Sequence, residues 1–451
     1  MDGASESLVR DEAARSPATA RRGRAARAGV RPPQPVLRPW LRAQSINVTR
    51  HAAALRPFRR EEFGTGAAAP SDGHIQAVNR LMASLRRGLL DLSRRVTQAV
   101  TAADAELTTP RLSEVVRRKD KAQHWVQGIE RIWDFYFELF GQRQSAPYAD
   151  WLLSCDRIAL DCYQAYWNGL GKPRPIPAPP PFCYMRTGFA PATFRRGIPL
   201  RRLGRQLNPF PIVQLPYHRL LNPWTLGAML HESSHNLQSE LGLSRDIPRA
   251  IARTLLDAGM PKNVAGIWTR WNREMFADMS ALLLGGPEVV GSLMDVVGRA
   301  PAAVFAYNPR GPHPTPYLRT LISVELLRRM GFAGQAERYR RAWIGIYPPP
   351  PAGAMPPGLL ETFPTACRLA VDAMCYRPYP SLGDKSLAQV VSFNDKDRHM
   401  TEEAAGRLAA GVDPGIVPAR FLIAAARIAL DRRLARPGVI ARNFYLELAR
   451  R

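Results

Sequence analysis

The stretch 222-NPWTLGAMLHESSHNLQSELG-242 has the clearest structural meaning in this chain. Asn222-Pro223 is typical of a helix start, and Gly242 is typical of the position that follows a helix end. Leu226, Ala228, Met229, Leu230 and Leu237 make the segment apolar on most sides, which predicts a buried helix. Unpaired polar groups are costly to bury, so such a helix needs a reason to carry a polar cluster. The polar positions are His231, Glu232, Ser234, His235 and Gln238.

Two histidines four residues apart lie on the same face of a helix. His231 and His235 can therefore offer two imidazole nitrogens to one metal ion, for which Zn²⁺ is the natural candidate. Glu232 then lies beside the metal, where it can accept a proton from water as a general base. The alternative interpretation is a chance match of a short pattern in a long chain.

A third ligand is predicted from the segment 271-WNREMFADMSALLLGGP-287, which reads as a second buried helix that ends at its glycines. Glu274 and Asp278 are again four residues apart. Glu274 is the better placed ligand, and Asp278 can accept the free N–H of a ligating histidine. The alternative is that both acids pair with Arg270 or Arg273 on an exposed stripe.

The combination of HExxH with a later ExxxD resembles the gluzincin class of zinc metallopeptidases. Together with His313-Pro314 and Arg319, it is loosely similar to the CAAX prenyl endopeptidase and HtpX-type family, over residues 223–319. The resemblance implies a zincin-like catalytic domain. It also implies zinc ligands at His231, His235 and Glu274, a general base at Glu232 and a supporting acid at Asp278, as that class has them.

The segment 311-GPHPTPYLRTLISVELLRRMG-331 predicts a helix that starts at Thr315-Pro316. His313 precedes that start and Arg319 lies in the first turn, so both are candidates, with Tyr317, to stabilise an oxyanion. The plainer alternatives are a turn histidine and a solvated arginine. A further alternative is that Arg319 pairs with Asp278 and holds two helices together.

Composition restricts the class of protein only weakly. The 451 residues have a formal net charge of +25, from 57 Arg and 6 Lys against 38 acids. This charge suits an acidic partner such as nucleic acid, but no recognisable nucleic-acid module accompanies it. Five cysteines without a C-x-x-C pattern exclude a disulfide framework. Without an apolar leader or a long apolar run, we expect a cytoplasmic protein with no transmembrane segment.

The chain divides by composition into four predicted regions. Residues 1–70 are Arg-rich with little apolar periodicity and predict a disordered tail, so a chain that begins near Ser71 should fold. We predict a helical region at 71–171, the zincin-like domain at 182–345 and a helical C-terminal region at 358–451. Proline-rich stretches at 172–181 and 348–357 separate them.

Short strand-like runs at 182–185, 197–203 and 211–215 precede the 222–242 helix. Pro209, Pro211 and Pro216 suggest that the last run is an edge strand, which in zincins receives the substrate. The expected fold is therefore mainly α with a small β-sheet (α+β).

These features predict a zinc-dependent peptidase that acts on a protein or peptide. Glu232 would activate the water, and the same metal could serve another hydrolysis. The alternative is a non-catalytic scaffold or a nucleic-acid- or protein-binding module that uses the basic N-terminal tail. Glu232 argues against a scaffold, since a scaffold has no need of a general base.

Overall fold

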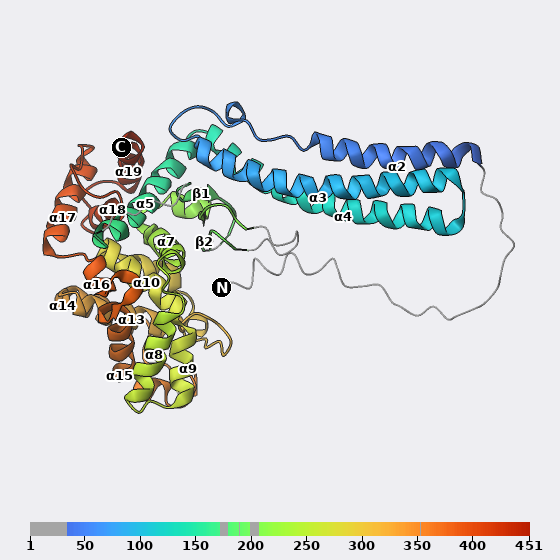
Figure 1. Cartoon of the computed structure of the whole chain (residues 1–451). Coiled ribbons are helices and arrows are strands. Elements are labelled where there is room, and N and C mark those ends of the chain that lie inside the picture. Colours follow the sequence, from blue (N-terminus) through green and yellow to red (C-terminus); the bar gives the residue numbers. More distant parts are fainter. Residues whose placement is uncertain (1–33, 172–178, 189, 199–206, 352) are drawn as a thin grey trace.

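The computed structural model of the chain describes residues 34–171, 179–188, 190–198, 207–351 and 353–451. The described residues are mainly helical with two small sheets, which confirms the expected fold class. A long three-helix bundle extends from a larger helical body (Figure 1). No described helix has both the length and the hydropathy that a bilayer crossing requires.

The bundle consists of α2 (Gln34–Ala54), α3 (Asp72–Ala105) and α4 (Thr109–Gly141). Its core is separate from that of the body and is rich in aromatic side chains near the body, where Phe58 and Phe63 contact Phe140. Thr108 and Pro110 mark the start of α4, with proline in the first turn where no backbone N–H is needed.

Helix α2 corrects the prediction of a disordered tail for residues 34–54. Its buried apolar side chains are Leu41, Val48 and Ala52, which form only a narrow seam against the other two helices. Ser and Thr side chains complete the contact, with hydroxyl pairs at 2.7 Å (Ser45 to Thr97) and 2.9 Å (Thr49 to Ser93). Apolar periodicity alone misses such an interface. Residues 1–33 of the predicted tail lie outside the described residues.

The body contains all later helices and a single continuous core. Its longer helices are α5 (Tyr148–Gly169), α7 (Gly227–Glu240), α8 (Asp246–Asp257), α9 (Lys262–Arg270), α10 (Asn272–Gly285), α11 (Glu288–Val297), α13 (Pro316–Arg329), α14 (Ala333–Ile346), α15 (Leu359–Val371), α17 (Asp395–Ala410), α18 (Phe421–Asp431) and α19 (Pro437–Arg450). Single turns form α6 (Tyr217–Leu220), α12 (Pro301–Val304) and α16 (Leu387–Val390), and strands β4 (Pro378–Tyr379) and β5 (Lys385–Ser386) pair antiparallel.

The body core includes residues on both sides of the predicted domain, so the predicted boundaries are wrong at both ends. Helix α5, assigned to the N-terminal region, packs in the body, where Arg420 forms an ion pair with Asp161 at 2.9 Å. The C-terminal helices share the same core, and the Tyr445 hydroxyl donates to the Leu220 carbonyl at 2.5 Å. The predicted linker at 172–181 falls largely on residues 172–178, which lie outside the described residues.

A three-stranded sheet lies between the two cores. Strand β3 (Ile212–Leu215) is central, parallel to β1 (Phe182–Met185) and antiparallel to β2 (Ala192–Phe194). Alternate side chains face opposite cores: Phe182 and Ile212 contribute to the bundle core, and Cys183 and Val213 to the body core. The sheet therefore joins the bundle to the body.

The predicted strand positions need two corrections. The run 211–215 is the central strand and not an edge, because its prolines flank Ile212–Leu215 and remove no N–H from the ladder. The edge strands are β1 and β2, and β2 at 192–194 is the one that lines the cavity described below. It lies ahead of the predicted run at 197–203, most of which lies outside the described residues.

All five cysteines are buried and free, as their spacing predicts.

Candidate metal centre

Helix α7 carries the HESSH residues and begins later than its sequence suggests. Asn222 makes no side-chain cap, since its amide donates to the His218 carbonyl at 2.9 Å. Pro223–Thr225 form a 3₁₀ turn, and the α-helix starts at Gly227. The predicted end is correct: Gly242, with a φ of 74°, follows the last turn and reverses the chain at a conformation that glycine adopts easily.

Small residues let α7 approach its neighbours closely. A Cβ atom at Gly227 would lie 2.6 Å from the Cβ of Ser292 on α11, and one at Gly285 would lie 2.6 Å from a methyl group of Leu230. Ser234 and Ser280 hydroxyls meet at 2.7 Å between α7 and α10, and the Tyr166 hydroxyl joins them at 2.7 Å. These contacts fix the two helices against each other.

This packing accounts for part of the polar cluster on α7 without a metal. Ser234 is hydrogen-bonded as described, and Gln238 donates to the Asn272 side chain at 3.3 Å. The histidines and Glu232 remain, and they line a cavity together with Gln238. The hydrogen bonds of Ser234 and Ser280 join helices that lie far apart in the sequence, so the spacing of residues could not predict them.

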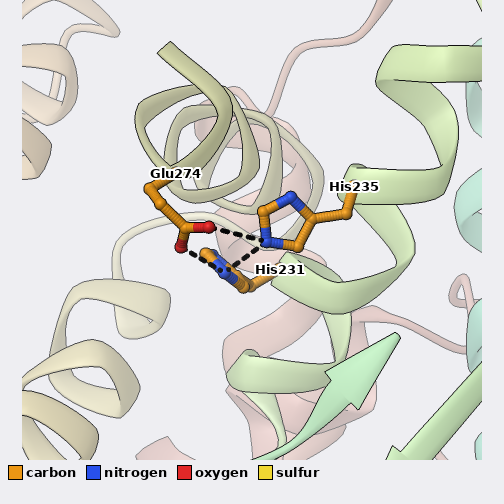
Figure 2. A group of neighbouring side chains, drawn as sticks. All are labelled: His231, His235 and Glu274. Carbon is orange, nitrogen blue, oxygen red and sulfur yellow. Dashed lines mark hydrogen bonds and ion pairs between the residues drawn. The ribbon is translucent and has the colours of Figure 1, made fainter. Parts of the chain in front are cut away.

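His231, His235 and Glu274 converge on one point between α7 and α10 (Figure 2). The Nε2 atoms of the two histidines are 3.0 Å apart, and each is 3.4 Å from a carboxylate oxygen of Glu274. Two ligand atoms at about 2.1 Å from a tetrahedral zinc ion are about 3.4 Å apart. In this triangle of candidate ligands, the two histidine-to-carboxylate distances match this spacing, and the distance between the two nitrogens is shorter.

Asp278 supports the triangle from the next turn of α10. Its Oδ1 atom is 2.7 Å from Nδ1 of His231, which leaves Nε2 directed at the other two residues. A carboxylate that is hydrogen-bonded to a histidine is the usual arrangement at metal sites. It fixes the orientation of the ring and makes the other ring nitrogen a stronger metal ligand. Asp278 therefore lies where the sequence predicted a supporting acid.

Arg319 and His313 approach the same carboxylates from the segment that leads into α13. Arg319 contacts Asp278 twice, Nε to Oδ2 at 2.5 Å and an NH₂ group to Oδ1 at 2.8 Å. This is the ion pair that the sequence left open as an alternative to a catalytic role. His313 lies with Nε2 at 3.1 Å from Glu274 and is more exposed.

The protonation of the cluster follows from burial and from these charges. Burial opposes protonation of His231, but Asp278 outweighs it and raises the pKa of His231 to about 10, whereas burial lowers the pKa of His235 to about 3. Burial also opposes ionisation of Asp278, yet Arg319 and His231 lower its pKa to about 2. His235 is thus neutral at pH 7, with a ring lone pair available to a metal.

The triangle opens onto a cavity of about 630 Å³, which we call the central cavity. Glu232 lines it beside the two histidines, as the sequence predicts for a general base. The edge strand β2 forms one wall and the apolar residues of α11 form another, including Val289, Leu293 and Val297. Sequence patterns gave no sign that α11 contributes, since it reads as an ordinary apolar helix.

Comparison of the chain with models of known families, with curated proteins and with solved structures gave no match.

Proposed function

We propose that the protein is a zinc-dependent hydrolase that cleaves peptide bonds in the central cavity. One observation carries this proposal: two histidine nitrogens and a carboxylate converge beside Glu232 in an open cavity. A structural zinc site is usually closed by four protein ligands, whereas a site with three ligands beside a cavity has room for water and substrate. Among the described residues, the predicted ligand group has three members.

His231, His235 and Glu274 would hold the ion. Bound zinc would lower the pKa of a water molecule toward neutrality and polarise the substrate carbonyl. Glu232 would accept the proton of that water and pass it to the leaving amine. Asp278 accepts the Nδ1–H of His231 and so directs Nε2 at the other two ligands, and this Nε2 would lose its proton when the ion binds. Arg319 holds Asp278, which makes Arg319 a positioning residue. His313 is the remaining candidate to donate to the oxyanion.

The edge strand β2 supports a peptide as the substrate. It belongs to the sheet through β3 on one side only, and its residues form part of the cavity wall. An extended peptide can add to such an edge through backbone hydrogen bonds. Asn236 on α7 donates to the Thr193 hydroxyl of β2 at 2.6 Å, so the strand is held next to the metal-site helix.

Turnover of a casein substrate by the zinc-loaded chain tests the proposal. Glu232→Gln should retain zinc and thermal stability but lose about 10²–10⁴ in turnover, because a positioned base contributes that much. Glu240→Gln is the matched control: it changes another acid of α7, one that pairs with Arg196 outside the cavity, and should keep full activity. Activity of Glu232→Gln within a few-fold of the unmodified chain would reject the mechanism, and no turnover by the unmodified chain would favour a scaffold.

A further inference from the structure

Besides Arg319, three arginines line the central cavity: Arg195, Arg273 and Arg299. None of them has a role in the proposed metal site, and the first two lie next to the edge strand and to Glu274. Arg195 directly follows the edge strand β2, and Arg273 directly precedes Glu274 in the first turn of α10. Both residues line the cavity, which also reaches the edge strand and the residues His231, His235 and Glu274. The charges of the two arginines therefore lie where a bound peptide would pass.

Neighbouring arginines have hydrogen-bond and ion-pair partners among the described residues. Arg196 forms a double contact with Glu240 at 2.7 and 2.9 Å, and Arg270 donates to the Gly311 carbonyl and the Tyr307 hydroxyl. Among the described residues, no carboxylate forms an ion pair with Arg195 or Arg273. Within the part of the chain that the structure describes, counter-ions thus pair with arginines near the cavity but not with Arg195 or Arg273.

The two guanidinium groups also act on each other. Burial and the charge of Arg273 lower the pKa of Arg195, so the two cations are close enough to repel. Like charges in a partly enclosed wall cost free energy unless an anion offsets them. The acids of the site are not available for this purpose, because Arg319 and a bound divalent ion would balance the charges of Glu232, Glu274 and Asp278.

We propose that Arg195 and Arg273 form a carboxylate-binding subsite, so that the preferred peptide carries a carboxylate beyond the scissile bond. This inference rests on the proposed function. A guanidinium group matches a carboxylate with two parallel hydrogen bonds, and two such groups can enclose one carboxylate. The carboxylate comes either from the C-terminus of the peptide or from an acidic side chain, and both sources offer the same chemistry.

Binding of defined peptide libraries to the zinc-loaded Glu232→Gln chain tests the subsite without turnover. Four fluorescent octapeptide libraries serve as probes: with or without Asp and Glu, each as the free acid or the C-terminal amide. A library that presents the preferred carboxylate should bind about 10- to 100-fold tighter than the neutral amide library, the range expected for hydrogen bonds to charged groups. The library that binds more tightly than the neutral amide library identifies the source of the carboxylate.

Adding Arg195→Gln and Arg273→Gln to that chain should remove most of the preference and leave binding of the neutral library, zinc content and thermal stability unchanged. Arg249→Gln with Arg253→Gln is the matched control, since it removes two exposed arginines of α8 outside the cavity and should keep the preference. Equal binding of all four libraries would overturn the subsite. A preference that survives the loss of both Arg195 and Arg273 would also overturn it.

Failure of the subsite and failure of the peptidase are distinguishable. If the unmodified chain cleaves the neutral library and carboxylates add nothing, the peptidase stands and the subsite is rejected. If the unmodified chain cleaves none of the libraries but binds carboxylates through the two arginines, the subsite stands and the peptidase is rejected.

Discussion

Arg319 and Asp278 form a buried ion pair at the site, with side chains 12% and 7% exposed. Two contacts between a guanidinium fork and one carboxylate fix both groups, and the same carboxylate orients His231. The sequence offered a catalytic role and a structural role for Arg319. The geometry favours the second, because both short contacts of the guanidinium go to Asp278 and not into the cavity.

Arg319→Ala should therefore lower stability and zinc affinity together. It leaves the Asp278 charge buried without its partner, and breaking a buried pair in this way typically costs about 3–5 kcal/mol. Thermal unfolding and zinc titration measure both effects, and Arg319→Lys should recover part of each because it restores the charge without the fork. Normal stability and zinc affinity with only turnover reduced would instead assign Arg319 to the oxyanion.

Glu288 gives a pH-dependent prediction that is independent of the metal site. Burial, with further contributions from Glu402 and Asp431, raises its pKa from 4.5 to about 7. The folded state therefore holds this proton more tightly than the unfolded chain, and the associated stability is present below pH 4.5 and lost as the pH rises through 7. Deprotonation of Glu288 thus penalises the folded protein at neutral and alkaline pH.

Glu288→Gln should remove that penalty. Relative to the unmodified chain, its free energy of unfolding should gain roughly 2 kcal/mol more at pH 8 than at pH 5. Denaturant unfolding at several pH values measures the difference, with Glu361→Gln as the control for an exposed acid in the first turn of a helix. A gain that does not depend on pH would show that Glu288 acts through packing.

Among the elements, the helices that carry the candidate metal ligands were predictable because local signals and apolar periodicity agree there. Thr315-Pro316 and Gly242 mark helix ends in the structure as they do in the sequence. The predicted start of α7 was wrong because a 3₁₀ turn precedes the α-helix. The run 211–215 was predicted as an edge strand because of its prolines, but these flank β3 and do not interrupt it. Helix α2 was missed because hydroxyl pairs complete its narrow apolar seam.

Helix α2 and the segment that follows it should contribute to the stability of the fold. A chain that begins at residue 34 should keep its stability, whereas one that begins at Ser71 should lose about 5 kcal/mol or more. The shorter chain lacks Leu41, Val48 and the aromatic pair Phe58 and Phe63, and each buried side chain of this kind contributes about 1.5–3 kcal/mol. Circular dichroism during thermal unfolding compares the two. Equal stability would restore the first interpretation of residues 34–70 as dispensable.

At the scale of the whole molecule, the described residues form two cores joined by one sheet, and the candidate site belongs to the larger core (Figure 1). Composition could not predict this division, because proline-rich stretches at 172–181 and 348–357 read as domain boundaries although the helices on both sides of each stretch share one core. The convergence of Glu274 on the two histidines was predictable from spacing. The arginine pair was not, since Arg195 and Arg273 meet only through the fold.

The zinc content of the full chain tests the central claim most directly. Elemental analysis of the purified protein should give about one zinc per chain. His235→Ala should lose most of it, while His218→Ala, which removes an exposed histidine just before α7, should retain it. Absence of zinc from the unmodified chain in the presence of excess metal, or full retention in His235→Ala, would contradict the assignment of His231, His235 and Glu274 as a metal centre.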